Sequence, residues 1–240
     1  MSEASRPFLT AQWRNLLILT YAVDPARIID LVPAGTTLDW WHSQALVSLL
    51  AFQFLDTKIL GTPIPFHQDF EEVNLRFYVR RSTVAGVRPG VVFIRELVPR
   101  PFVGRMARLL YREPYQVVPM RSKVRPGPPP NVEYQWDVGS HWCTVAAEGQ
   151  GEGSEPAPGS LAEFLTVRHW GYNGEEGNDT LEYRVDHPRW NTWHAENARV
   201  DYNAEILCGM ELAPQLKTPI SALIADGSAV TIHWRNRIAA

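Results

Sequence analysis

Residues 71–80 carry four side chains that could perform acid–base chemistry or bind an anion. Apolar and polar residues alternate strictly along this run, and the polar positions are Glu72, Asn74, Arg76 and Tyr78. Such alternation is typical of a strand with two different faces. The polar face either contacts water, as in most half-buried strands, or lines an interior site. In a site, the acid could transfer a proton and an arginine could bind a carboxylate.

Amine chemistry has few candidates in this chain. Of its 23 basic residues 20 are arginine, and the lysines are Lys58, Lys123 and Lys217. Lys123 lies between Arg121 and Arg125, whose charges would favour a neutral amine. The proline-rich stretch that follows nevertheless predicts an exposed strand end, and we expect Lys123 to be solvated.

Other chemistry-bearing motifs are missing from the sequence. The seven histidines form no HxH or HExxH pattern, and neither a metal site nor a cofactor is expected. GxSxG, P-loop and GxGxxG motifs are absent as well. Cys143 and Cys208 have no CxxC spacing, so we expect two reduced thiols.

The elements that must position these residues are mostly strands. Runs with strand character cover residues 16–23, 45–54, 73–80, 90–98, 115–120, 131–138, 141–149, 180–187, 193–202 and 229–237. Short helices are predicted over 24–32, 104–112 and 160–170, with Asp24 and Ser160 as N-caps. This order predicts an α+β, mainly β protein.

The organisation is that of one domain over residues 1–240. A chain of this length buries enough surface to need no metal or disulfide for stability. Residues 148–159 are rich in Gly, Pro and Glu and predict a flexible surface loop.

Composition argues against nucleic-acid and membrane partners. The formal net charge of −3 gives no broad attraction to polyanions. No apolar run reaches the ~20 residues that a spanning helix needs, and no secretory signal opens the chain. We therefore expect a cytoplasmic protein, whose oligomeric state the sequence leaves open.

Several stretches together resemble the YqjF-like family of bacterial proteins, a domain of unknown function. They are "FLTAQWRNLLILTYAVDPARIIDLVPAG", "FEEVNLRFYVR", "ARLLYREPYQVVPM", "LAEFLTVRHWGY" and "VDHPRW". That family is regarded as distantly related to acetoacetate decarboxylase. The resemblance implies an acetoacetate decarboxylase-like, cone-shaped β-barrel with a few short helices and a central cavity.

The resemblance also implies where the decarboxylase site would fall. The arginine of that site corresponds to Arg14 and one of its glutamates to Glu72, whereas the other glutamate corresponds to Leu50. The lysine pair that supplies the Schiff base corresponds to Tyr115 and Gln116. Because a phenol cannot form an imine, we expect no Schiff-base decarboxylation.

The leading hypothesis is a cavity that binds a small carbonyl or carboxylate compound. Glu72 and Tyr115 are its candidate catalytic residues, and Arg14, Asn74 and Arg76 are its candidate substrate-binding residues. The chemistry, if any, would be cofactor-independent proton transfer or hydration on an enolisable acid. The alternatives are a binding protein without turnover and a partner-binding protein that uses a tryptophan-rich surface.

Overall fold

Strands dominate the computed structural model, which describes residues 7–139, 141–174 and 179–238. The long central strands are β1 (Pro7–Val23), β3 (Ala45–Ile59), β5 (Phe70–Thr83), β6 (Gly86–Val98) and β14 (Ser221–His233). The others are β2 (Thr37–Leu38), β4 (Thr62–Pro63), β7 (Tyr115–Val117), β8 (Met120–Arg125), β9 (Asn131–Asp137), β10 (Trp142–Gly149), β11 (Trp170–Gly174), β12 (Thr180–Asp186), β13 (Thr192–Asp201) and β15 (Asn236–Ile238). The mainly β prediction is confirmed.

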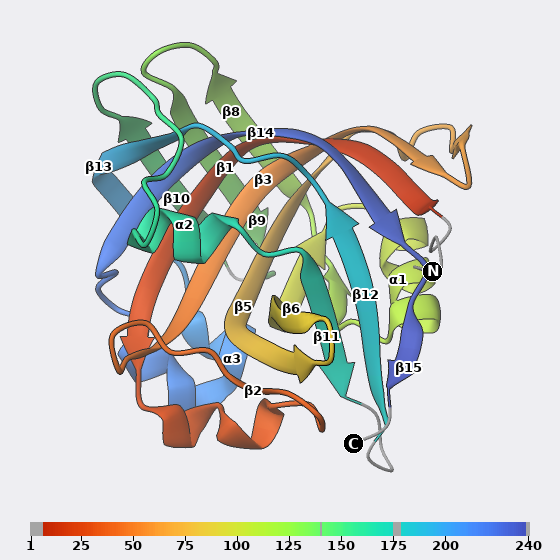
Figure 1. Ribbon diagram of the computed structural model, residues 1–240. Coiled ribbons are helices and arrows are strands. Elements are labelled where there is room, and N and C mark those ends of the chain that lie inside the picture. The colour runs from red at the N-terminus through yellow and green to blue at the C-terminus, as the bar shows by residue number, and fades with distance from the viewer. Residues whose placement is uncertain (1–6, 140, 175–178, 239–240) are drawn as a thin grey trace.

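These strands form one strongly curved sheet (Figure 1). Its order is β15-β12-β11-β6-β5-β3-β1-β14-β13-β10-β9-β8, and β12 also pairs with β14 through Val185 and Ile232. Most neighbours are antiparallel, whereas β6 pairs in parallel with both β7 and β11. The pairing of β12 with β14 brings two distant parts of the strand order together around the interior.

Each face of the central strands packs against its own hydrophobic cluster. On β5, Val73, Leu75, Phe77 and Val79 belong to the larger cluster. Tyr78 belongs to a second cluster on the opposite face. Both faces of this strand are therefore buried, and its polar side chains meet the protein interior.

Within the described ranges, three α-helices and short 3₁₀ turns lie against this sheet. The helices are α1 (Pro101–Tyr111), α2 (Leu161–Thr166) and α3 (Ala204–Leu212), and 3₁₀ turns cover Pro25–Arg27, Ile29–Leu31 and Ala213–Gln215. The helix predicted over 24–32 is thus two 3₁₀ turns, although Asp24 does cap the first. Helix α3 was not predicted. In Figure 1, α1 lies at the side of the sheet near β12 and β15.

Helix α2 is shorter than its sequence pattern indicates. Ser160 accepts a hydrogen bond from the Glu163 amide at 3.2 Å and caps the helix as expected. The helix ends at Thr166 because the following residues turn toward the sheet and Trp170 begins β11. A tertiary contact with β6 replaces the last turn that local sequence favours.

The segment predicted as a loop, 148–159, begins with the last two residues of β10. From residue 150 it runs as irregular backbone, held by reciprocal backbone hydrogen bonds between Ser154 and Thr192. Its flexibility stays a prediction. No helix in the described ranges is long and apolar enough to cross a membrane.

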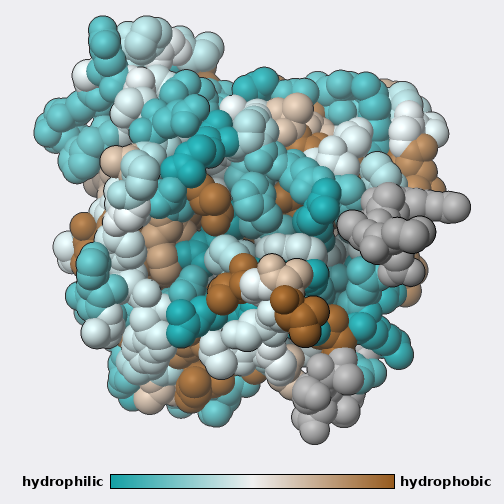
Figure 2. Space-filling view, viewed as in Figure 1, coloured by the Kyte–Doolittle hydropathy of each residue, from teal (hydrophilic) through white to brown (hydrophobic). Residues whose placement is uncertain are grey.

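Hydrophobic residues are scattered over the face of the molecule seen in Figure 2. They form small separate groups between hydrophilic and intermediate residues on that face. That face therefore offers no broad apolar area for a protein partner.

Candidate functional site

The polar face of β5 lies inside the protein. Glu72 and Asn74 are 3% exposed and Arg76 is 8% exposed. The Asn74 side-chain amide donates to Glu72 Oε1 at 3.0 Å. The polar face of this strand is buried, so the prediction of a solvated face is wrong.

Arg14 does not join this group. It lies at a β-bulge, where the register of β1 against β3 shifts between Arg14 and Leu17 and Asn15 has a φ of 58°. The extra residue switches the inward positions from Trp13 before the bulge to Leu16 after it, because a bulge reverses the alternation of side chains. Arg14 instead donates to the Gly227 carbonyl and to Gln12 Oε1. The expected convergence of Arg14 with Glu72 is therefore wrong.

Tyr115 reaches Glu72 through the parallel pairing of β6 with β7. Its hydroxyl donates to Glu72 Oε2 at 3.0 Å. The same register places Glu96 directly opposite Tyr115. The two residues named as candidate catalytic groups are thus in direct contact, and a second acid lies beside them.

Glu96 and Glu113 extend this contact into a network of buried groups. Their carboxyl groups interact directly, and such a pair of buried acids is stable only when at least one of them carries a proton. Tyr183 donates to Glu113 Oε1 at 2.9 Å. We call the set formed by Glu72, Glu96, Glu113, Tyr115 and Tyr183 the carboxyl network.

Burial raises the pKa of all three carboxyl groups. Desolvation raises the pKa of Glu72 to about 7, opposed by hydrogen bonds from Asn74 and Tyr115 and by the charge of Arg76. Desolvation raises the pKa of Glu113 to about 8, and raises that of Glu96 well above its ordinary value with help from its acidic neighbours. Three carboxyl groups so close together cannot all ionise at neutral pH.

A cavity of about 70 Å³ opens beside Glu72, Asn74, Arg76, Glu96 and Tyr115. We call it the polar cavity. Its other walls are Trp13, Leu16, Leu50, Phe52, Phe54, Val91, Phe93, Thr166, Arg168, Trp170, Gly171, Tyr183, Val185, His187, Trp190 and Ile232. The residue corresponding to the second decarboxylase glutamate, Leu50, therefore does lie in the wall.

Buried polar atoms of this wall lack partners. Within the described ranges, no hydrogen bond reaches Asn74 Oδ1, Arg76 Nε or Glu96 Oε2. An unsatisfied buried polar atom costs roughly 1–3 kcal/mol, and such atoms gather where a ligand can be bound. Arg76 donates to the Leu165 carbonyl at 3.0 Å and forms no ion pair within 4.0 Å in the described part of the chain.

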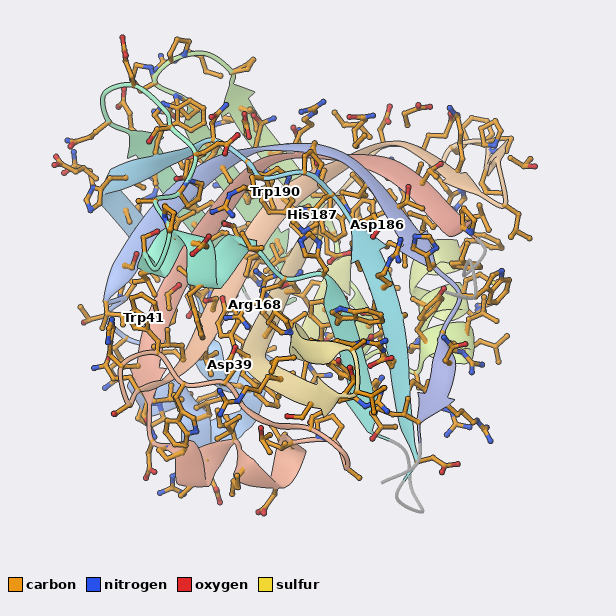
Figure 3. All side chains as sticks on the ribbon, in the orientation of Figure 1. Asp39, Trp41, Arg168, Asp186, His187 and Trp190 are labelled. Atoms are coloured by element: carbon orange, nitrogen blue, oxygen red, sulfur yellow. The ribbon has the colours of Figure 1, made fainter. Side chains whose placement is uncertain are left out.

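The side of the polar cavity near α2 and β12 carries a second arginine. Arg168 pairs with Asp39 at 2.5 Å and lies over the Phe164 ring. His187 stacks on Trp190 with ring centroids 4.3 Å apart, and burial lowers the pKa of the histidine. Figure 3 shows Arg168 beside Asp39, and His187 beside Trp190.

All three lysines lie outside the polar cavity. Lys58 pairs with Asp56, and Lys217 is exposed. The Lys123 side chain is 81% exposed and lies 3.7 Å from Glu133, in the solvated position that the sequence predicted. No three His, Cys, Asp or Glu side chains in the described ranges are placed to hold a metal ion.

Sequence reasoning missed Glu96, Glu113, Arg168 and Tyr183. Glu96 had a usable signal, because an acid stands within the otherwise apolar end of "GVVFIRELV". Glu113 and Tyr183 come from segments with no such pattern and meet only in the tertiary structure. Arg168 lies just after α2 in a stretch that the sequence predicted as helix.

A family model and a curated protein match this sequence. The model of DUF2071, described as an uncharacterized conserved protein, matches residues 10–229. Over 112 residues the chain is 31% identical to the uncharacterized protein YqjF of Bacillus subtilis (strain 168). That match covers 46% of this chain and 45% of YqjF, so it spans less than half of the curated relative.

Solved structures share the fold at low sequence identity. Acetoacetate decarboxylase from Legionella pneumophila superposes with a TM-score of 0.68 at 13% identity, over 98% of this chain and 88% of that one. The enduracididine biosynthesis enzyme MppR complexed with pyruvate gives 0.66 at 12% identity, over 98% and 92%. An acetoacetate decarboxylase-like enzyme from Sphingomonas wittichii RW1 gives 0.64 at 14%, over 98% and 94%. These similarities show an acetoacetate decarboxylase-like fold.

Proposed function

We propose that this chain, which belongs to the DUF2071 family of uncharacterized conserved proteins, binds a small carbonyl or carboxylate compound in the polar cavity. We further propose that it moves a proton on that compound without a Schiff base. The observation that carries the proposal is the meeting of Glu72, Glu96 and Tyr115 at a cavity wall that also holds Arg76.

Arg76 is the proposed anchor for the carboxylate. Its guanidinium is buried, has an unpartnered Nε and forms no ion pair in the described ranges. A buried arginine without a carboxylate partner favours an anionic ligand, because guanidinium binds carboxylates through two parallel hydrogen bonds. Arg168 is already neutralised by its ion pair with Asp39, so the proposed anchor is Arg76.

The carboxyl network divides the acid and base roles. Glu72, with a pKa of about 7, is half ionised near neutral pH and is the proposed base for a proton α to the carbonyl. Burial raises the pKa of Glu96 well above its ordinary value, and protonated Glu96 is the proposed donor to the carbonyl oxygen, whereas Tyr115 donates to Glu72 and positions that base. Glu72 takes the proton of the broken C–H bond, whose electron pair becomes the enol double bond, and the carbonyl oxygen gains the proton of Glu96.

The fold relatives support the substrate class. Solved structures of MppR hold pyruvate and its condensation product with imidazole 4-carboxaldehyde, and acetoacetate decarboxylase is named for a 3-oxo acid. Fold alone does not carry function, and here the lysine of the decarboxylase corresponds to Tyr115. The proposal therefore keeps the oxo-acid substrate class and replaces imine chemistry with proton transfer.

The test is deuterium exchange of 2-oxo and 3-oxo acids in D₂O, followed by NMR, together with thermal shift for binding. Arg76→Gln should weaken binding at least tenfold, because a charge-assisted hydrogen bond contributes roughly 1.5–3 kcal/mol. Arg14→Gln is the matched control, and binding should be unchanged because Arg14 lies outside the cavity wall. Binding that survives Arg76→Gln, or a borohydride-trapped adduct on a lysine, would contradict the proposal.

A second candidate is binding without turnover. Both oxygens of Glu72 already accept hydrogen bonds, from Asn74 and Tyr115, which favours a structural role for this carboxylate. In that case the acids bind and Arg76 is required, but no deuterium enters the ligand. Glu72→Gln would then cause no loss of affinity, whereas the catalytic proposal expects it to abolish exchange.

A further inference from the structure

We infer that a second, apolar cavity behind the carboxyl network takes a hydrocarbon substituent of the bound compound. The inference rests on the proposed function and names its substrate class: an oxo acid or related carboxylate that carries an apolar chain or ring. A compound of this kind would place its carboxylate at Arg76 and its substituent against helix α1.

The apolar cavity has a volume of about 90 Å³ and lies between α1, β3 and the segment that precedes β5. Helix α1 contributes Phe102, Val103, Met106, Ala107 and Tyr111 to its wall. Its other residues are Phe8, Leu9, Phe54, Thr57, Ile59, Ile64, His67, Phe70, Glu72, Glu96, Glu113, Tyr115, Tyr183 and Ile232.

The two cavities share part of the carboxyl network as a common wall. Glu72, Glu96, Tyr115 and Tyr183 line both of them. A reacting carbon held against Glu72 and Tyr115 therefore has one neighbouring space that is polar and another that is apolar. A substrate with a charged end and a hydrocarbon end matches this division.

The two cavities differ in the charges of their walls, and this difference sets the orientation of the bound compound. The polar cavity holds Arg76 and Arg168, whereas no Arg or Lys lines the apolar cavity in the described part of the chain. Burial raises the pKa of Glu96 and Glu113 in this wall, and Glu72 is half ionised near neutral pH, so these acids give the wall at most a partial negative charge at low and neutral pH. A ligand carboxylate is thus stabilised only on the side of the arginines.

Burial of hydrocarbon supplies the affinity that the apolar cavity adds. Each buried methylene contributes ~0.8 kcal/mol, which corresponds to a roughly fourfold lower Kd. We expect straight-chain carboxylates from acetate to octanoate to bind progressively more tightly, by about this factor for each methylene, until the cavity is full.

The experiment is calorimetric titration of this carboxylate series into the full chain and its variants. Ala107→Trp fills the apolar cavity and should stop the gain in affinity at a shorter chain. Ala107→Leu should do so less strongly and serves where the larger side chain disturbs folding. Leu109→Trp is the matched control on the same helix, because Leu109 is 69% exposed and outside the wall, and its series should equal that of the unmodified protein.

The results separate this inference from the proposed function. Arg76→Gln should weaken every member of the series by a common factor and leave the chain-length gain intact. If carboxylates need Arg76 but bind equally tightly at all chain lengths, the inference that the apolar cavity binds the substituent is wrong, and the proposed function still holds. Straight-chain alcohols that gain affinity with length and are blocked by Ala107→Trp support the apolar cavity, even if acids bind without Arg76 and the proposed function fails.

Discussion

Replacing Glu72 with glutamine should make this protein more stable at pH 8 but not at pH 4.5. The reason is that the folded protein holds Glu72 with a pKa of about 7, against an ordinary value of 4.5 for the unfolded chain. Below pH 4.5 the carboxyl group is protonated in both states. Between pH 4.5 and 7 the unfolded chain releases this proton while the folded protein keeps it, so the free energy of unfolding falls as the pH rises.

The size of the effect follows from the two pKa values. Each pKa unit of difference between the folded and unfolded states is worth ~1.4 kcal/mol. The free energy of unfolding therefore falls by about 3 kcal/mol between pH 4.5 and 8. Glutamine escapes this loss but forfeits one accepted hydrogen bond, from Asn74 or Tyr115, at a pH-independent cost of ~1 kcal/mol. Removing the Glu72 charge also lowers the pKa of Glu96 and Glu113, which adds to the difference in the same direction.

Urea unfolding at pH 4.5, 6 and 8, followed by tryptophan fluorescence, measures this difference. The free energy of unfolding of Glu72→Gln minus that of the unmodified protein should rise by about 3 kcal/mol over this range. Glu71→Gln is the matched control, because Glu71 is the neighbouring acid on β5, outside both cavities, and accepts from Ser122 Oγ at 2.9 Å. Parallel pH curves for Glu72→Gln and the unmodified protein would refute the reasoning, since they would mean that Glu72 ionises alike in both states.

Three further predictions follow from the same contacts. Carboxylate binding should weaken above pH 7, because ionised Glu72 adds a negative charge beside Arg76. Titrations at pH 6 and 8 measure this change, and Glu72→Gln should remove the pH dependence. Tyr115→Phe removes a hydrogen bond that lowers the pKa of Glu72, so the pH profile of deuterium exchange should move to higher pH; an unmoved profile would show that another group is the base. Gly227→Ala should destabilise the protein by about 1–3 kcal/mol or more in urea unfolding. Gly227 has a φ of 77°, and a Cβ there would lie 2.1 Å from the Trp13 carbonyl oxygen. A smaller loss would mean that the backbone at this bulge can shift to admit the methyl group.

Local sequence was sufficient wherever a pattern stays within one element. The alternation in 71–80 placed Glu72, Asn74 and Arg76 on one face of β5, and that face does line the polar cavity. The resemblance to the YqjF-like family and the mainly β character are confirmed by the DUF2071 match and by the fold relatives. The cone-shaped barrel, the single domain and the roles of the site residues stay predictions.

The errors have a common cause in contacts between distant segments. Arg14 was placed by its correspondence to the arginine of the decarboxylase site, but the bulge between Arg14 and Leu17 reverses the alternation of β1, and the guanidinium donates to the Gly227 carbonyl instead. Helix α2 ends early because Trp170 pairs with Gly90 on β6.

The sequence by itself determined the residue types available for chemistry: a strand with an acid, an amide and an arginine on one face, and three lysines, of which Lys123 was expected to be solvated. Only the tertiary structure decided which of them meet. Parallel pairing of β6 with β7 sets Glu96 opposite Tyr115, and the packing of α1 creates a second cavity behind them. The physical reason is that side-chain direction along a strand is local, whereas strand register and the burial that raises the pKa of a carboxyl group depend on residues far away in the chain.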